Sequence, residues 1–131
     1  MGSNAAIVKA IYEAMARGDV PAVLGAFDPE IEWYEAEGNP LEDGNPYRGG
    51  GAVASGVFKR LIDRVDRFSA TPANVIDGGD TVVVEGRYRG QVKGSDRQVD
   101  SQFAHVWHLR NGKVVRFQQY TDTKQWAEIF R

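Results

Sequence analysis

The chain has 131 residues, a net charge of −2 with acidic and basic residues interspersed, and no cysteine. A chain of this size buries roughly two thirds of its surface on folding, so we expect one domain over residues 1–131 that needs no covalent staples. The missing cysteine excludes disulfides and thiolate chemistry, and the near-balanced charge argues against nucleic acid as a partner.

The chain carries no sign of membrane insertion or export. No apolar run approaches the roughly 20 residues that cross a bilayer. The first residues, Met-Gly-Ser-Asn-Ala-Ala, lack the basic-then-apolar order of a signal peptide. We therefore expect a soluble protein of the cytoplasm without a membrane partner.

Helical spacing of apolar residues dominates the first half of the chain. Residues 4–17 predict one helix, and Asp19 caps a second, short helix that Asp28-Pro29 ends. A third helix is expected over residues 52–65. Its predicted inward face consists of Val53, Val57, Phe58, Leu61, Ile62 and Val65.

A strand and a loop separate the second and third helices. Alternation over residues 31–35 puts Ile31, Trp33 and Glu35 on one face, so a carboxylate shares an apolar face. Residues 36–51 are rich in glycine and contain two prolines. They predict a long loop, which makes this segment a candidate lid or pocket rim.

The second half of the chain predicts a meander of strands. Residues 68–76 form a proline-containing edge strand, and residues 81–93 a long strand in which Gly86 and Gly90 mark bulges or bends. Residues 98–110 form the next strand. A last strand follows the turn at residues 110–113, and residues 123–130 predict a short helical turn.

The turn at Asn111-Gly112 is the strongest local signal, because this dipeptide favours the type I′ turn of a tight hairpin. On the arms of the hairpin, His105 shares a face with Phe103, Trp107 and Leu109, and alternation turns Gln119 to the same side. Asp122 is in phase with the opposite side. It reaches the interior only if the last strand breaks its period, and otherwise caps the C-terminal helix.

Three helices with one inserted strand, followed by a four-stranded meander, predict an α+β fold. The glycines would let the antiparallel sheet curl around the N-terminal helices as a cone-shaped α+β barrel. Such a sheet, covered by helices, leaves a concave apolar interior.

Five phrases, at residues 11–19, 26–33, 77–90, 103–115 and 117–123, cover nearly the whole chain. In type and order they resemble the nuclear transport factor 2-like superfamily, which has a cystatin-like fold, and specifically its SnoaL-like polyketide cyclase branch, related to ketosteroid isomerase. That superfamily includes isomerases, cyclases, epoxide hydrolases, dehydratases and proteins without catalytic activity.

The resemblance implies candidate catalytic residues. In the polyketide cyclases a histidine seven residues before the hairpin glycine and an aspartate ten residues after it meet in the pocket, and these positions are His105 and Asp122. In the steroid isomerases the proton-shuttling carboxylate lies eight residues after the phenylalanine that ends the second helix, which here gives Glu35.

Each candidate also has a purely structural interpretation. His105 can be a hydrogen-bonded core residue, Asp122 a helix cap, and Glu35 a solvated residue at the end of its strand. The candidate substrate-binding residues, of which the aromatic ones can equally be packing residues, are Gln119, Trp33, Tyr12, Phe58, Trp107, Phe117 and Tyr120.

These features predict a cofactor-independent lyase or isomerase acting on a small hydrophobic carbonyl compound. Asp122, or alternatively Glu35, would remove a proton next to the carbonyl, and His105 and Gln119 would hydrogen-bond the enolate oxygen. We expect no metal, because His105 and His108 point to opposite faces of their strand. The alternative is a non-catalytic dimeric module that binds a hydrophobic ligand or a protein partner. Under either hypothesis we expect a homodimer formed through the outer face of the sheet.

Overall fold

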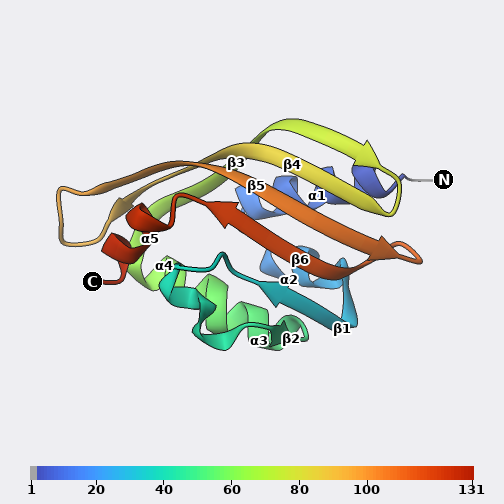
Figure 1. Ribbon diagram of the computed structural model, residues 1–131, viewed down its shortest axis with the longest axis horizontal. Helices are drawn as coiled ribbons and strands as arrows, with labels where there is room; N and C mark the ends of the chain where they lie inside the picture. Colours follow the sequence, from blue (N-terminus) through green and yellow to red (C-terminus); the bar gives the residue numbers. More distant parts are fainter. Residues whose placement is uncertain (1–2) are drawn as a thin grey trace.

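The computed structural model describes residues 3–131 as a curved six-stranded sheet with helices gathered against one side of it (Figure 1). Met1 and Gly2, part of the segment inspected for a signal peptide, lie outside the described residues. The helical elements are α1 (Asn4–Ala16), α2 (Val20–Gly25), η1 (Pro40–Gly44), α3 (Gly50–Val53), η2 (Ala54–Phe58), α4 (Lys59–Arg64) and α5 (Thr123–Ile129). The strands are β1 (Phe27–Tyr34), β2 (Tyr47–Arg48), β3 (Val65–Gly78), β4 (Thr81–Val92), β5 (Gln98–Arg110) and β6 (Lys113–Thr121).

The strand order is β2-β1-β6-β5-β4-β3, so the sheet stays open, with β2 and β3 at its edges. All neighbours are antiparallel except β1 and β6, which run parallel. The predicted α+β class, with a curved sheet around the helices, is confirmed. None of the helices in residues 3–131 is long and apolar enough to span a membrane.

The first two helices follow their predicted signals. Ser3 caps α1 by accepting a hydrogen bond from the Ala6 N–H at 3.0 Å, and Asp19 caps α2 by accepting one from the Ala22 N–H at 3.1 Å. Both caps satisfy backbone donors that have no partner within their own helix. The buried face of α1 includes Tyr12, whose hydroxyl reaches the sheet.

The third helix is not the continuous α-helix that was predicted. A π-helical segment, η2, separates α3 from α4. Val53, Val57 and Leu61 are buried as expected, whereas Ile62 is 56% exposed and borders the cavity, so it lies at the edge of the predicted inward face and not in the core.

The predicted long loop over residues 36–51 contains regular structure. The helical turn η1 and the short strand β2 both lie within it, and Tyr47 of β2 pairs with Trp33 of β1. The Asn39 side chain caps η1 by accepting a hydrogen bond from the Leu41 N–H at 3.0 Å. The segment is thus tied to the sheet directly beside the end of β1.

The hairpin between β5 and β6 is confirmed, because Asn111 and Gly112 have φ values of 53° and 74°. The bulges expected on β4 lie instead on its neighbour β3, between residues 66 and 69 and between residues 72 and 74. Gly86 allows close approach: a Cβ atom there would lie 2.2 Å from the Thr71 carbonyl oxygen. The glycine therefore serves the contact with the bulged edge strand.

Candidate active site

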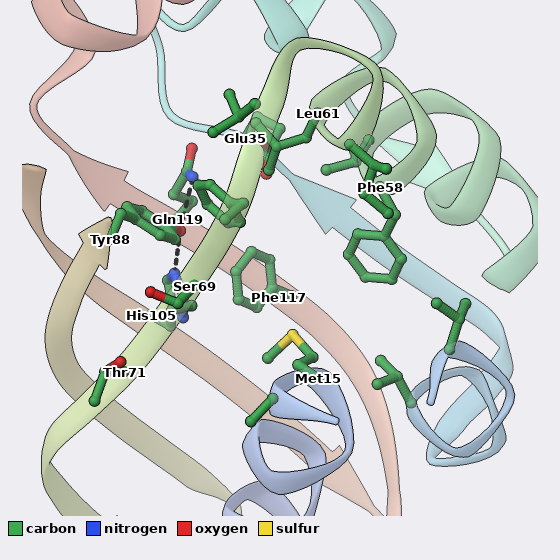
Figure 2. A pocket seen from close by; sticks show the side chains of 18 of the residues that line it. Met15, Glu35, Phe58, Leu61, Ser69, Thr71, Tyr88, His105, Phe117 and Gln119 are labelled. Carbon is green, nitrogen blue, oxygen red and sulfur yellow. Dashed lines mark hydrogen bonds between the residues drawn. The ribbon is translucent and has the colours of Figure 1, made fainter. Parts of the chain in front are cut away.

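A cavity of about 400 Å³ lies between the helices and the inner face of the sheet (Figure 2). Its wall is largely apolar and draws on α1, α4, α5 and the strands. The apolar residues around it include Met15, Val23, Trp33, Val57, Phe58, Leu61, Val65, Phe68, Trp107, Phe117 and Trp126. The polar side chains in this wall are Glu35, Arg67, Ser69, Thr71, Tyr88, His105 and Gln119, and the buried ones among them are Glu35, Tyr88, His105 and Gln119. This volume is within the usual range for sites that enclose a small molecule.

Glu35 follows directly after β1 and is 2% exposed. The Asn45 side chain holds its backbone on both sides: the Glu35 N–H donates to Asn45 Oδ1 at 2.9 Å, and Asn45 Nδ2 donates to the Glu35 carbonyl oxygen at 2.8 Å. The strand face on which Trp33 lies also directs Glu35 inward, as its alternation predicted. Of the two interpretations of Glu35, the structure shows the buried one.

The Glu35 carboxylate has only neutral hydrogen-bond donors. Trp33 Nε1 donates to Oε2 at 2.9 Å, and Asn39 Nδ2 donates to Oε1 at 3.3 Å. Burial raises the pKa of Glu35 to about 7, and the hydrogen bonds from Trp33 and Asn39 moderate this rise. Near neutral pH the carboxyl group therefore exists in both protonation states, as a group that accepts and returns a proton requires.

An amide network connects Glu35 to the inner face of the sheet. Asn39 Nδ2 also donates to Gln119 Oε1 at 2.9 Å, and the same oxygen accepts a hydrogen bond from the Ala36 N–H at 3.1 Å. Gln119 Nε2 then donates to the Tyr88 hydroxyl oxygen at 2.9 Å. Because both ends of the Gln119 amide are engaged, its side chain is held in one orientation.

His105 is buried and lies between two tyrosines. Its Nδ1 is 2.6 Å from the Tyr12 hydroxyl oxygen. Its Nε2 is hydrogen-bonded to the Tyr88 hydroxyl, as Figure 2 shows. Trp107 Nε1 donates to the Tyr12 oxygen at 3.0 Å. Burial lowers the pKa of His105 to about 3, so the ring is neutral at physiological pH. His105 is thus a hydrogen-bonded member of the core that also borders the cavity.

Asp122 lies outside the cavity. It is exposed and forms the N-cap of α5, with its carboxylate accepting hydrogen bonds from the backbone N–H groups of Lys124 and Gln125 at 3.1 and 3.4 Å. The register of β6 shifts near the hairpin, between Val114 and Arg116, but the strand alternates regularly from Phe117 through Tyr120, so no bulge near its end turns Asp122 inward. The capping interpretation therefore corrects the expectation that Asp122 meets His105 in the pocket.

The other predicted residues separate into three groups. Trp33, Phe58, Trp107, Phe117 and Gln119 line the cavity. Tyr12 is 3% exposed and lies behind this wall in contact with His105. Tyr120 is 56% exposed on the other side of the sheet, and its predicted contact with the substrate is corrected by this position.

Three residues that the sequence analysis did not select contribute to the site. Tyr88 joins Gln119 to His105, and Asn39 joins Glu35 to Gln119. Trp126 of α5 borders the cavity with its indole ring edge-on to Tyr88, at a centroid separation of 5.1 Å. Two of them had a signal in the sequence: Tyr88 is in phase with Val82 and Val84, and Trp126 lies four residues before Phe130 in the predicted helical turn.

The buried part of the site offers one carboxylate, neutral hydrogen-bond donors and aromatic walls, and Arg67 of β3 adds a cationic side chain to the lining. Among residues 3–131, no group of three or more histidine, aspartate or glutamate side chains could hold a metal ion. The chemistry available to these side chains is proton transfer at Glu35 within an apolar enclosure.

The fold and this cavity define a nuclear transport factor 2-like α+β protein. The chain belongs to the family of SnoaL-like domains, whose model matches residues 8–117. An NTF2-like protein from Burkholderia thailandensis E264 is 34% identical, with a TM-score of 0.92 and 100% of this chain and 99% of that chain covered.

Two further solved structures share the fold. TerC, co-crystallised with polyporic acid, is 24% identical, with a TM-score of 0.83 and 96% of each chain covered. IdmH from Streptomyces antibioticus, a proposed polyketide cyclase, is 16% identical, with a TM-score of 0.82 and coverage of 98% of this chain and 99% of that chain. No curated protein matches the chain in sequence.

Proposed function

We propose that this SnoaL-like protein is a cofactor-independent lyase or isomerase of the cyclase type, in which Glu35 performs acid/base chemistry on a small hydrophobic carbonyl compound. The observation that carries the proposal is a buried carboxylate, with its pKa raised to about 7, in the wall of an apolar cavity of about 400 Å³. A carboxyl group tuned to neutral pH in this way is suited to remove a weakly acidic proton from carbon.

In the proposed reaction Glu35 takes a proton from the carbon next to the carbonyl group. The electrons of the broken C–H bond form the enolate, whose negative charge rests on the carbonyl oxygen. The protonated Glu35 then returns the proton at another carbon, which completes an isomerisation. In a lyase reaction, the protonated Glu35 gives the proton to the oxygen of the leaving group as the enolate expels it. In a cyclase reaction, the enolate carbon attacks another carbonyl carbon of the ligand, and Glu35 gives the proton to the alkoxide oxygen that forms.

The apolar walls support this chemistry in two ways. Trp33 and Phe117 stack with ring centroids 3.7 Å apart, and Phe58 packs edge-on against Trp33. These rings keep bulk water from Glu35, which sustains the raised pKa, and they offer flat surfaces to a cyclic ligand. The names of structural neighbours, TerC with polyporic acid and the proposed polyketide cyclase IdmH, agree with a ligand of this kind.

Exchange of carbon-bound protons in heavy water tests the proposal. The probe is α-tetralone, a two-ring ketone with exchangeable protons next to its carbonyl group, followed by proton NMR. We expect the wild-type protein to accelerate loss of that signal and Glu35→Gln to abolish the acceleration. Equal exchange by the two proteins would overturn the proposed role of Glu35.

The outer face of the sheet favours a second proposal, that two copies pair through this face. Ile76, Val83 and Val106 are register partners across β3, β4 and β5 on this side of the sheet, and Ile76 is 47% exposed. An apolar row of this kind suits a self-complementary contact between two copies. Under the alternative hypothesis, a non-catalytic module would use the same dimer to hold a ligand or a protein partner.

Sedimentation of the wild type and of Val83→Glu tests this pairing. We expect the wild type to sediment with a dimer mass and the variant with a monomer mass, because the new charge would be buried in the contact. A monomeric wild-type protein would contradict the proposed dimer.

A further inference from the structure

The polar network beside the cavity begins and ends at groups whose hydrogen-bonding direction is fixed. Trp107 Nε1 can only donate, and it donates to the Tyr12 oxygen at 3.0 Å. Gln119 Oε1 accepts from the Ala36 N–H, so Gln119 Nε2 donates to the Tyr88 oxygen at 2.9 Å. Each tyrosine hydroxyl therefore accepts one hydrogen bond independently of His105.

His105 connects the two hydroxyl groups, with Nδ1 on Tyr12 and Nε2 on Tyr88. A neutral imidazole carries one N–H donor and one acceptor nitrogen. The two hydroxyl groups and the neutral imidazole ring together carry three O–H or N–H protons. The two hydrogen bonds between the ring and the hydroxyl groups use only two of these protons. One tyrosine hydroxyl proton is left without an acceptor in the network, and the tautomer of His105 decides which one.

The surroundings of the two tyrosines differ. Tyr12 does not line the cavity that holds Glu35; it borders a separate hollow between α1 and β3, it is 3% exposed, and His105 Nδ1 is the one acceptor that its hydroxyl contacts among residues 3–131. Tyr88 lines the cavity, where a ligand can supply an acceptor. A buried donor without a partner is destabilising, so the favoured arrangement lets Tyr12 donate to Nδ1 and leaves the surplus proton on Tyr88.

We propose that Tyr88 is the hydrogen-bond donor for the carbonyl oxygen of the ligand, and that His105 holds it ready by carrying its own proton on Nε2. The Tyr88 oxygen accepts from both Gln119 and His105, and two such bonds polarise its O–H and strengthen it as a donor. His105 and Gln119 are thus positioning residues rather than direct contacts of the ligand oxygen. The ligand class is a hydrophobic molecule with an acceptor oxygen, such as a ketone or an enolate.

The reactive role of Tyr88 rests on the proposed function, but its binding role needs no turnover. The first experiment is nitrogen NMR of protein with isotopically labelled histidine, without ligand. We expect His105 to carry its proton on Nε2 and to leave Nδ1 unprotonated. A proton on Nδ1 would place the surplus hydroxyl proton on Tyr12 and overturn the proposal.

The second experiment compares the binding of α-tetralone with that of tetralin, the same two-ring skeleton without the carbonyl group, by calorimetry. We expect Tyr88→Phe to lower the preference for the ketone roughly three- to tenfold and to leave tetralin affinity unchanged. Tyr47→Phe is the matched control, because Tyr47 is a buried tyrosine outside the cavity whose hydroxyl donates to the Leu41 carbonyl oxygen. It should keep the full ketone preference.

The two proposals fail in different ways. If ketone preference depends on Tyr88 but no carbon-bound proton exchanges, the donor role stands and the catalytic proposal falls. If exchange depends on Glu35 but Tyr88→Phe keeps the ketone preference and His105 carries its proton on Nδ1, the catalytic proposal stands and the donor role is overturned. If neither α-tetralone nor tetralin binds, the tautomer of His105 decides whether the donor role of Tyr88 stands.

Discussion

Glu35 and Asp122 follow the ends of two neighbouring parallel strands, yet their surroundings are opposite. Tyr34, the last residue of β1, pairs with Gln118 of β6, so the two strands run side by side. Glu35 is enclosed with neutral donors in an apolar cavity, whereas Asp122 stands in solvent and caps α5. Desolvation within this enclosure raises the pKa of the Glu35 carboxyl group.

Strand phase produces this difference. Glu35 is in phase with the buried Trp33, and Asp122 is in phase with the exposed Tyr120. One residue more or less in either strand would exchange inside and outside, since successive side chains point to opposite faces. Position in the strand register, rather than the type of acid, therefore determines which of the two carboxylates is the candidate base.

The largest expected effect is on activity. Glu35→Gln keeps the shape of the side chain and one of its two acceptor oxygens but removes its capacity to accept a proton. We expect it to lower the exchange rate of α-tetralone at least 100-fold, the usual minimum for loss of a general base. Asp122→Asn should leave that rate within about twofold, because Asn is an equally good helix cap. A larger loss in Asp122→Asn than in Glu35→Gln would reverse the comparison.

The next effect concerns the dependence of stability on pH. Glu35 has its pKa raised from 4.5 to about 7, so the folded protein holds this proton more tightly than the unfolded chain does. As pH rises through this window, the unfolded chain releases the proton first, and the free energy of unfolding falls. A shift of this size corresponds to a loss of about 3 kcal/mol above the folded pKa.

Urea unfolding over a range of pH measures this contribution. The lowered pKa of His105 makes stability rise with pH over an overlapping range, so the contribution of Glu35 is read from the difference between wild type and Glu35→Gln. We expect the stability of the wild type relative to Glu35→Gln to decline between pH 4.5 and about 7. This decline should persist in Asp122→Asn, whose side chain is solvated. A stability difference between wild type and Glu35→Gln that stays constant across the same window would contradict the raised pKa of Glu35.

A smaller effect is expected from Trp33→Phe, which removes the N–H donor to Glu35 Oε2. That hydrogen bond favours the ionised carboxylate, so its loss should raise the midpoint of the pH–activity profile, by up to about one unit. Trp107→Phe is the matched control, since the Trp107 N–H donates to Tyr12 instead. Equal shifts in the two variants would show that altered packing, rather than the hydrogen bond, sets the midpoint.

The smallest effect should come from Asp122→Ala. Loss of the cap leaves the N–H groups of Lys124 and Gln125 to water, at a cost of about 1 kcal/mol in the free energy of unfolding. Chemical denaturation measures this cost, and the exchange rate per folded molecule should stay the same. Loss of activity without loss of stability would instead indicate a direct role in the chemistry.

Local signals predicted much of this fold. The caps of α1 and α2, the hairpin at Asn111-Gly112 and the inward side of His105 and Gln119 all follow from spacing of a few residues. These features depend on contacts close in sequence, which patterns of polarity record directly.

The parts that were missed depend on distant partners. Tyr88 becomes a site residue only once β4 and β5 pair with Val84 opposite His105, and Asn39 only once the segment after β1 folds back onto Gln119. The π-turn between α3 and α4 has no simple sequence pattern. Such features depend on how the sheet and the helices assemble, and the spacing of apolar residues along the chain does not record this assembly.

Direct titration of the Glu35 carboxyl group tests whether burial raises its pKa as its role as the base requires. Carbon NMR of protein with labelled glutamate, compared with Glu35→Gln to assign the signal, follows this one group as pH changes. We expect the Glu35 carboxyl group to titrate with a midpoint at a pH of about 7. A midpoint near the ordinary value of 4.5 would show that the carboxyl group is solvated, and would contradict its role as the base.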